Sequence, residues 1–180
     1  PDQIKKYQEG CDKAGLSLVP LAVNPVDAVW PDHPARPQAT AKVHPADIAG
    51  CSHEDKRTNI AELLAKEGYD ALLVTAPDSV CWLFNIRGAD VENTPLVLAS
   101  ALLFASGDAI LFIDPAKVTD AIRTHLGNNV TLAVADGLGA AIDSLHDSVS
   151  VVAVDQITIS QWAVDRLEAS GLRVKPIDDP

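Results

Sequence analysis

Residues 69–90 read YDALLVTAPDSVCWLFNIRGAD, a stretch in which an apolar run passes directly into a helix-forming segment. The run at 69–75 has the length and composition of a buried β-strand. Pro77 opens the helix that follows over 79–85, because proline is well tolerated in the first turn of a helix. Gly88 ends this helix. The stretch therefore predicts a strand followed closely by a helix, which is the building unit of an α/β fold.

The same kind of pattern extends in both directions. Upstream, Ser52 is a good N-cap for a helix that ends at Gly68. Downstream, the apolar runs 96–105 and 109–113 are joined by a short turn, which predicts an antiparallel hairpin. The remaining expected elements are a helix at 115–126, a strand at 130–134, a helix at 138–145, a strand at 149–154, a helix at 160–170 and a strand at 172–176.

This alternation around one hairpin predicts the fold class α/β, with a mixed β-sheet flanked by helices on both faces. The length of 180 residues suits one domain with an appendage. No internal repeat is evident. The appendage is expected at the N-terminus, with a helix at 2–14, a strand at 17–23 and a brief helical turn between Asn24 and Trp30.

Four prolines follow within fifteen residues: Pro31, Pro34, Pro37 and Pro45. Such spacing removes backbone donors and favours extended polyproline geometry. We therefore expect residues 1–45 to comprise the tail of a preceding domain and a proline-rich linker, and residues 46–180 to form the main domain.

Composition excludes several classes of function. The net charge is -11, and a surface this acidic disfavours binding to nucleic acid or to anionic membranes. No apolar run approaches the length of a membrane-spanning helix. The three cysteines are odd in number and widely spaced, which indicates a reducing compartment and predicts a cytoplasmic protein. Cys81 lies among apolar residues and is expected to be a small buried hydrophobe.

The motifs of several enzyme classes are missing. The sequence contains no GxGxxG or GxxxxGK[ST] nucleotide loop, no GxSxG elbow and no HExxH metal motif. The five histidines stand in polar contexts, which predicts that most of them are solvated. The polar clusters 44–47 and 53–55 lie at a linker and at a helix start, where acidic residues complement the helix dipole. No residue is therefore predicted to be catalytic or to bind a metal ion.

One segment differs in composition from an ordinary connection between a helix and a strand. Residues 82–95 concentrate aromatic, amide and charged side chains between a helix and a strand. The guanidinium of Arg87 is suited to binding a carboxylate, either that of a ligand or that of Asp90 in an ion pair that fixes the loop. Both interpretations stay open. The candidate residues for a substrate cleft are Trp82, Asn85, Arg87 and Asp90.

The segment PDSVCWLFNIRGAD at 77–90, followed by NTP at 93–95, resembles the Xaa-Pro aminopeptidases (aminopeptidase P) in their long, three-domain form. NPVDAVW at 24–30 with Arg36-Pro37, and LFID at 111–114 with Lys117, agree with this resemblance. It implies that the chain is the second N-terminal domain, a creatinase/prolidase N-terminal domain of ribonuclease H-like architecture. Residues 1–23 would be the tail of the first.

The resemblance also implies a function. The parent enzyme would be a metallopeptidase that removes N-terminal residues preceding proline, with two manganese or zinc ions held in a catalytic domain that these residues do not include. This chain would border the active-site cleft and be inactive alone. Its partners would be the catalytic domain of the same chain and proline-containing peptides. A homodimer of the parent would be possible. The alternative is a free-standing, non-enzymatic binding module of the same fold.

Overall fold

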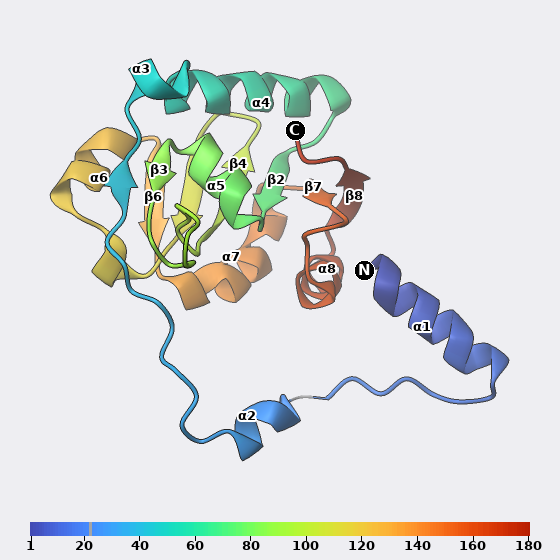
Figure 1. Ribbon diagram of the computed structural model, residues 1–180. Coiled ribbons are helices and arrows are strands. Elements are labelled where there is room, and N and C mark those ends of the chain that lie inside the picture. The colour runs from blue at the N-terminus through green and yellow to red at the C-terminus, as the bar shows by residue number, and fades with distance from the viewer. Residues whose placement is uncertain (22) are drawn as a thin grey trace.

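The structure, a computed structural model, describes residues 1–21 and 23–180. Its central sheet contains β2 (Ala71–Val74), β4 (Ser100–Phe104), β5 (Ala109–Phe112), β6 (Val130–Ala133), β7 (Val151–Asp155) and β8 (Arg173–Ile177). The strands lie in the order β6-β5-β4-β2-β7-β8 (Figure 1). Strand β2 is antiparallel to β4 and parallel to β7, so the sheet is mixed, as the sequence predicts.

The predicted hairpin is present. Strand β4 pairs antiparallel with β5, and Gly107 in the turn between them has a φ of 87°, a conformation that glycine adopts without steric cost. The outer pairs β5–β6 and β7–β8 are parallel. Each of these two parallel connections runs through helical segments that cover the sheet, as parallel pairing requires.

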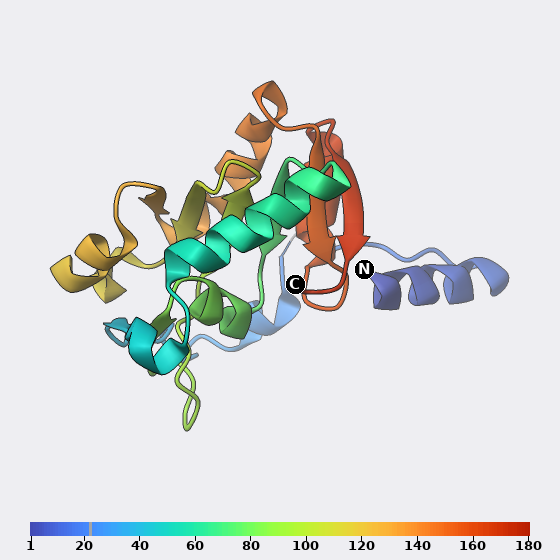
Figure 2. The same cartoon turned by 90° about the horizontal axis from the view of Figure 1, so that it is seen from above.

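Helices cover both faces of the sheet (Figures 1 and 2). The helices α4 (His53–Glu67), α5 (Pro77–Leu83) and α6 (Asp120–Leu126) enclose one hydrophobic cluster, whereas α7 (Leu138–Ser144) and α8 (Gln161–Ala169) enclose the other. Successive side chains of a strand point to opposite faces. Leu72 of β2 accordingly packs in the first cluster and Leu73 in the second.

Local signals explain where the principal helix begins and ends. The Ser52 hydroxyl accepts a hydrogen bond from the backbone N–H of Asp55 and donates one to its carboxylate, so the predicted cap of α4 is confirmed. Gly68 closes α4 in the left-handed conformation, with a φ of 73°. The short elements are α2 (Pro25–Val29), β1 (Lys42–Val43), α3 (Ala46–Ala49), β3 (Ile86–Arg87), η1 (Pro115–Lys117), η2 (Ala135–Gly137) and η3 (Leu145–Asp147).

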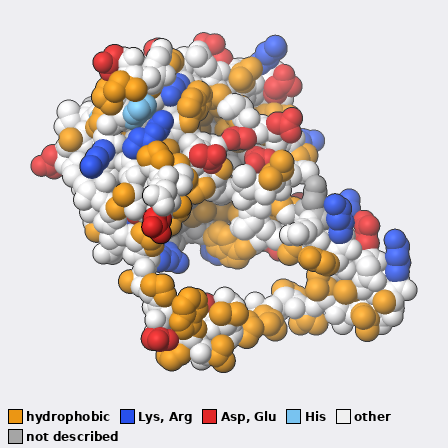
Figure 3. All heavy atoms as spheres, viewed as in Figure 1, with side chains coloured by type: hydrophobic (Ala, Val, Ile, Leu, Met, Phe, Trp, Pro, Cys, Tyr) orange, Lys and Arg blue, Asp and Glu red, His pale blue; other side chains and the backbone are white. Residues whose placement is uncertain are grey.

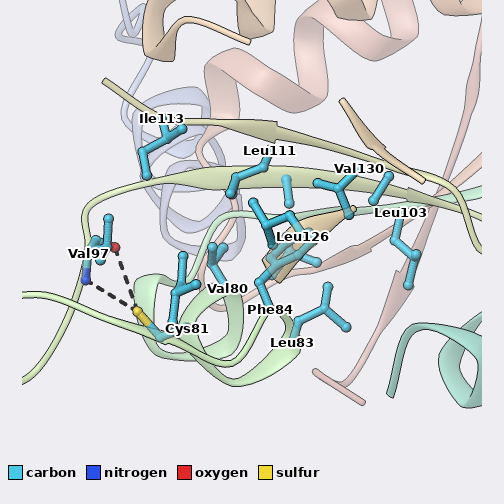
Figure 4. Packing of buried hydrophobic residues seen from close by; sticks show 14 of the residues in the cluster. Val80, Cys81, Leu83, Phe84, Val97, Leu103, Leu111, Ile113, Leu126 and Val130 are labelled. Atoms are coloured by element: carbon cyan, nitrogen blue, oxygen red, sulfur yellow. Dashed lines mark hydrogen bonds between the residues drawn. The ribbon is translucent and has the colours of Figure 1, made fainter. Parts of the chain in front are cut away.

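The packing around Cys81 confirms that this residue is a small buried hydrophobe (Figure 4). The backbone N–H of Val97 donates to its sulfur over 3.2 Å, which ties the loop before β4 to α5. Burial raises the pKa of the Cys81 thiol. The thiol therefore stays protonated at neutral pH and acts as a packing group rather than as a nucleophile.

The N-terminal arm, of which residues 1–21 and 23–30 are described, extends away from the sheet (Figure 1). The expected helix is present as α1 (Asp2–Lys13), and Asn24 caps α2 through a hydrogen bond from the Val26 amide. The strand expected at 17–23 is not formed over residues 17–21, which have no strand partner among the described residues; Ala22 lies outside them. A strand needs a neighbour for its backbone groups, and in the part of the chain that the structure describes no strand pairs with residues 17–21.

The chain joins the main body before residue 45. Ala41 is buried, and β1 pairs antiparallel with β3 in a separate two-stranded ribbon. The strand expected at 96–105 is shortened to β4, because the residues before it form the base of a hairpin turn. Within the described ranges, no helix is both long and apolar enough to cross a membrane.

Candidate functional site

The unusual segment 82–95 runs from the end of α5 through β3 into a turn that projects from the body (Figure 2). A bridge between Val91 and Thr94 closes this turn. The four residues predicted from the sequence fall into two groups. The side chains of Asn85 and Asp90 are buried, whereas Trp82 is 43% exposed and Arg87 is half-buried.

Asp90 fixes the base of the projecting turn. Its carboxylate accepts hydrogen bonds from the backbone N–H of Leu98 at 2.7 Å and of Ala39 at 3.2 Å. The ammonium of Lys117 donates to the same carboxylate at 2.6 Å, and both side chains are buried. One carboxylate therefore joins three segments that are far apart in the sequence.

The alternative in which Asp90 pairs with Arg87 is wrong. Nη1 of Arg87 instead donates to the backbone carbonyls of Cys81 and Ile86 at 2.9 and 2.8 Å. These bonds hold the guanidinium against the C-terminal end of α5, where the carbonyl groups lack helical partners. Charge complementarity with the negative end of the helix dipole adds to them.

Asn85 is a second fixed point of the loop. Its φ is 49°, in the left-handed region that asparagine tolerates better than most residues. The side-chain oxygen accepts a 2.6 Å hydrogen bond from Lys56, and the side-chain amide donates to the carbonyl of Cys51. The Asn85 carbonyl also accepts from the His44 amide. The asparagine thus connects the end of α5 to His44, which precedes α3, and to Cys51, which follows it.

Lys56 connects the buried asparagine to the exposed tryptophan. Its ammonium donates to the carbonyl of Trp82 and lies 4.5 Å from the centre of the indole ring. Such a cation–π contact holds the ring in one orientation. Burial lowers the pKa of Lys56, and the nearby charge of Arg87 lowers it further, while Cys51 opposes this shift.

Gly88 is required by a close approach rather than by an unusual backbone angle. A Cβ at this position would lie 2.6 Å from Cγ2 of Val97 and 2.9 Å from the carbonyl oxygen of Leu96. Both distances are too short for real carbon contacts. The asparagine, arginine, glycine and aspartate of this loop thus all have roles in folding.

A small hollow lies beside Trp82. It has a volume of about 340 Å³ and is lined by Asp78, Ser79, Trp82, Asp179 and Pro180. The Ser79 hydroxyl donates to the carboxylate of Asp179, which draws the end of β8 and the residues after it onto the start of α5. Trp82 is thus an exposed aromatic residue that lines a hollow together with two carboxylates and a hydroxyl, an arrangement suited to contact with a peptide.

Sequence reasoning missed a pair of histidines. The rings of His53 and His125 are in contact with their planes tilted by 52° and their centres 4.4 Å apart. His53 is buried, so the expectation of solvated histidines is wrong for it. Nε2 of His53 donates to the carbonyl of His125, and Nε2 of His125 donates to that of Phe84. The pair joins α4, α6 and the candidate loop, a convergence that no local pattern in the sequence signals.

The model of the Creatinase/Prolidase N-terminal domain family matches residues 32–180. The chain belongs to this family. The match covers the whole sheet, both helical layers and the candidate loop. The predicted fold and the predicted resemblance are thereby confirmed.

Curated relatives of this creatinase/prolidase N-terminal domain include probable Xaa-Pro aminopeptidases P. That of Coccidioides posadasii strain C735 is 39% identical over 131 residues, which are 72% of this chain and 20% of the relative. That of Aspergillus niger is 32% identical over 149 residues, 82% of this chain and 24% of the relative. The chain thus spans about a fifth of the length of the curated relatives it matches.

Two solved structures bear on the fold. X-prolyl aminopeptidase from Caenorhabditis elegans, described as a cytosolic enzyme with a di-nuclear active site, superimposes with a TM-score of 0.86 at 24% identity over 98% of this chain and 29% of its own. The N-terminal domain of the cytoplasmic peptidase PepQ from Mycobacterium tuberculosis gives 0.52 at 16% identity over 69% of this chain and 93% of its own. At these identities the likeness establishes the fold.

The described residues of this creatinase/prolidase N-terminal domain do not supply the donor set that a pair of metal ions needs. Among residues 1–21 and 23–180, no three histidine, cysteine, aspartate or glutamate side chains converge in a way that could hold a cation. The Asp90 carboxylate already binds Lys117 and two amides, and Nε2 of His53 lies against the carbonyl of His125 and 2.9 Å from Oε1 of Glu54. The polar cluster at 44–47 leads into α3, and the polar cluster at 53–55 forms the start of α4.

Proposed function

We propose that this creatinase/prolidase N-terminal domain is the non-catalytic N-terminal domain of a metal-dependent Xaa-Pro aminopeptidase, an enzyme that removes the N-terminal residue preceding proline. The observation that carries the proposal is the 39% identity with a probable Xaa-Pro aminopeptidase P over 131 residues, 72% of this chain. Proline-containing peptides are then the substrates of the whole enzyme, and its catalytic domain is the principal partner of this one.

Two manganese or zinc ions are expected in that enzyme, and we assign them to its catalytic domain because the residues described here lack a suitable donor set. Such a metal pair would supply a bridging hydroxide and stabilise the charge that develops on the scissile carbonyl. No chemical step is assigned to a residue of this chain. We further propose a cytoplasmic location, supported by the free, widely spaced cysteines. We also propose that the parent enzyme can form a homodimer.

The domain would contribute one border of the active-site cleft. Trp82 and Arg87 are the residues proposed to face it, since Trp82 is exposed and Arg87 retains donors beyond Nη1. Asn85 and Asp90 would act as positioning residues, because their side chains are buried and already bonded within the domain. A rigid loop is suited to this task, since a displacement of even about 1 Å can slow a reaction substantially.

The test uses the complete polypeptide and an Xaa-Pro peptide with added manganese. We expect Trp82→Ala and Arg87→Ala each to lower kcat/KM about tenfold, with the temperature of unfolding nearly unchanged for Trp82→Ala. Trp162→Ala is the matched control, because Trp162 is 51% exposed on α8, on the other face of the sheet. Unchanged kinetics in both variants would leave these residues a structural role only.

The alternative is a free-standing binding module of the same fold, which would bind a peptide in the hollow beside Trp82. Peptidase assays discriminate between the two. The complete polypeptide should hydrolyse the Xaa-Pro bond, and the 180-residue chain should not. Hydrolysis by the 180-residue chain alone would overturn the proposal, as would an inactive complete polypeptide that binds peptide without cleaving it.

A further inference from the structure

Three basic side chains bind backbone carbonyls at the C-terminal end of α5, the helix that carries Trp82. They are those of Lys56, Arg87 and His125. The last carbonyls of a helix lack helical partners, so donors from outside the helix satisfy them. Nε2 of His125, on α6, donates to the carbonyl of Phe84 at 2.9 Å. Because Asn85 follows Phe84 directly, α6 holds the point at which α5 passes into the candidate loop.

His125 is held in turn by His53, the first residue of α4. Nε2 of His53 lies 2.8 Å from the carbonyl oxygen of His125 and 2.9 Å from Oε1 of Glu54. Both of these oxygens accept hydrogen bonds, so Nε2 carries the proton of the neutral ring. The two imidazole rings are also in contact. A chain of contacts therefore runs from α4 through α6 to the carbonyl of Phe84.

The other nitrogen of the His53 ring, Nδ1, is buried and has no hydrogen-bond partner within the described part of the chain. The residue as a whole is 2% exposed, and Figure 3 shows little histidine on the visible face of the molecule. Protonation of the ring would turn Nδ1 from an unused acceptor into a charged donor. A buried charged donor without an acceptor is much more costly than a neutral nitrogen, so these surroundings favour the neutral ring.

The charged groups that face the His53 ring come from α4 and from α6. Burial is the largest cause that lowers the pKa of His53. The positive charges of His125, on α6, and of Arg57, one turn along α4, lower it further. The bond to the His125 carbonyl and the charge of Glu54 raise it, but the Glu54 side chain is 60% exposed and is screened by water. Asp108, in the turn between β4 and β5, faces Arg57. The ring therefore stays neutral until the pH falls below the ordinary range of histidine.

We propose that His53 and His125 form a proton-sensitive latch on the candidate loop. The neutral His53 ring holds α6 against the end of α5, and protonation of this ring releases α6 and with it the carbonyl of Phe84. Trp82 lies on the helix whose end is then loosened, so its position is no longer fixed. The latch is a regulatory device of the proposed cleft border, and it rests on the proposed function only where it concerns peptide hydrolysis.

Histidine suits a switch of this kind, because its ordinary pKa of about 6.5 lies within the physiological range. When the latch opens, the His53 ring enters water and binds a proton more readily than in the closed state. One proton taken up on opening favours the open state about tenfold for each pH unit between about 6.5 and the pKa of the closed state. The bonds from Arg87 to the carbonyls of Cys81 and Ile86 do not depend on pH in this range, because the guanidinium keeps its charge. The end of α5 therefore loosens without unfolding.

Hydrogen exchange of the complete polypeptide tests the latch without an assay of activity. The Asn85 amide donates to the carbonyl of Trp82, so its exchange reports when the end of α5 opens. After correction for the intrinsic pH dependence of exchange, its protection should fall at least about threefold between about pH 7 and 5.5. This opening exposes little surface, so the exchange rate should hardly depend on low concentrations of urea. Exchange that follows global unfolding, with its full urea dependence at each pH, would overturn the proposal.

Two variants show whether His53 is the group that takes up the proton. His53→Gln keeps a donor for the His125 carbonyl but cannot be protonated, so the protection of the Asn85 amide should become independent of pH below about pH 7. His33→Gln is the matched control, since His33 is exposed on the proline-rich stretch, and this variant should keep the fall in protection. A fall that persists unchanged in His53→Gln would refute the latch.

Hydrolysis of an Xaa-Pro peptide by the complete polypeptide gives a readout at the site itself. Below about pH 6.5, a loosened loop should raise KM more than it lowers kcat, because Trp82 and Arg87 are proposed to contact the peptide. With each protein normalised to its own value at about pH 7.5, His53→Gln should retain about two to three times more kcat/KM than the original enzyme at about pH 5.5. Parallel pH profiles for the two proteins would overturn the regulatory role.

The two readouts separate the latch from the proposed function. If the Asn85 amide responds to pH as expected but the complete polypeptide does not cleave Xaa-Pro peptides, the latch stands and the proposed function fails. If the peptides are cleaved but the exchange of this amide is the same at each pH, the latch fails and the proposed function stands.

Discussion

Nζ of Lys117 lies 2.6 Å from Oδ2 of Asp90, and the two buried side chains form an ion pair that also anchors two backbone amides. Asp90→Asn leaves the lysine charge buried without its partner. We expect this change to lower the free energy of unfolding by about 3–5 kcal/mol. Asp136→Asn removes the partner of Arg36 in a highly exposed pair and should cost less than about 1 kcal/mol. Urea unfolding measures both, and equal losses would contradict this account.

Gly88→Ala should destabilise the domain by about 1–3 kcal/mol, because the new methyl group would overlap Val97 and the Leu96 carbonyl. Gly10→Ala is the matched control. Gly10 lies within α1, nothing lies within 4 Å of a Cβ built on it, and alanine favours a helix more than glycine does. Thermal unfolding should show a lower midpoint temperature for Gly88→Ala and no decrease for Gly10→Ala. An unchanged midpoint for Gly88→Ala would disprove the close approach.

Asn85 combines a positive φ with buried hydrogen bonds, and two variants separate these contributions. Asn85→Gly keeps the backbone conformation accessible but removes the bonds to Lys56 and Cys51. It should cost about 1.5–3 kcal/mol, since the lysine loses a buried acceptor. Asn85→Ala should cost about 1 kcal/mol more, because it adds the strain of a left-handed residue with a Cβ. Identical unfolding curves for the two variants would argue against the strain.

Burial of the His53 imidazole lowers its pKa, and the neighbouring charges of His125 and Arg57 act in the same direction, whereas the bond to the His125 carbonyl and Glu54 oppose the shift. The unfolded chain, with a histidine pKa of about 6.5, binds more protons than the folded chain between the two pKa values. The free energy of unfolding should therefore fall as the pH drops from about 7 through 6.5 to the pKa of His53 in the folded chain. Below that pKa, His53 should cause no further change.

The pH dependence is checked by urea unfolding at a series of pH values. His53→Gln keeps a donor for the His125 carbonyl but cannot take up a proton, so it should flatten the curve of stability against pH below about pH 7. His33→Gln serves as the control, since His33 is exposed on the proline-rich stretch. A curve that stays as steep in His53→Gln as in the original chain would refute the assignment.

The elements that the sequence predicts well are those whose signals are local. The turn at Ser106–Asp108 lies between two apolar runs, so the hairpin of β4 and β5 could be recognised from neighbouring residues. The same holds for α4, which begins at a capping serine and ends at a glycine. The family resemblance also rests on a contiguous segment, residues 77–90, and the comparisons confirm it.

What the sequence could not predict depends on tertiary contacts. Asp90 has an arginine three residues away but pairs with Lys117, because the fold brings η1 beneath the projecting turn. His53 looks like a polar residue at a helix start, yet α6 covers it. The strand expected at 17–23 has the right composition, but residues 17–21 have no strand partner among the residues that the structure describes. Whether Trp82 and Arg87 contact a peptide stays a prediction.

Pro176 has a consequence for how this protein behaves at high concentration. The amide positions of β8 that face away from β7 include the proline, which has no hydrogen to offer. Another chain that paired with this edge of the sheet would find no backbone donor at the position of Pro176. Strand β6, at the opposite margin, has no proline and exposes Thr131. Any ordered aggregate of this domain should accordingly start from β6, and a lysine introduced there should keep the protein dispersed.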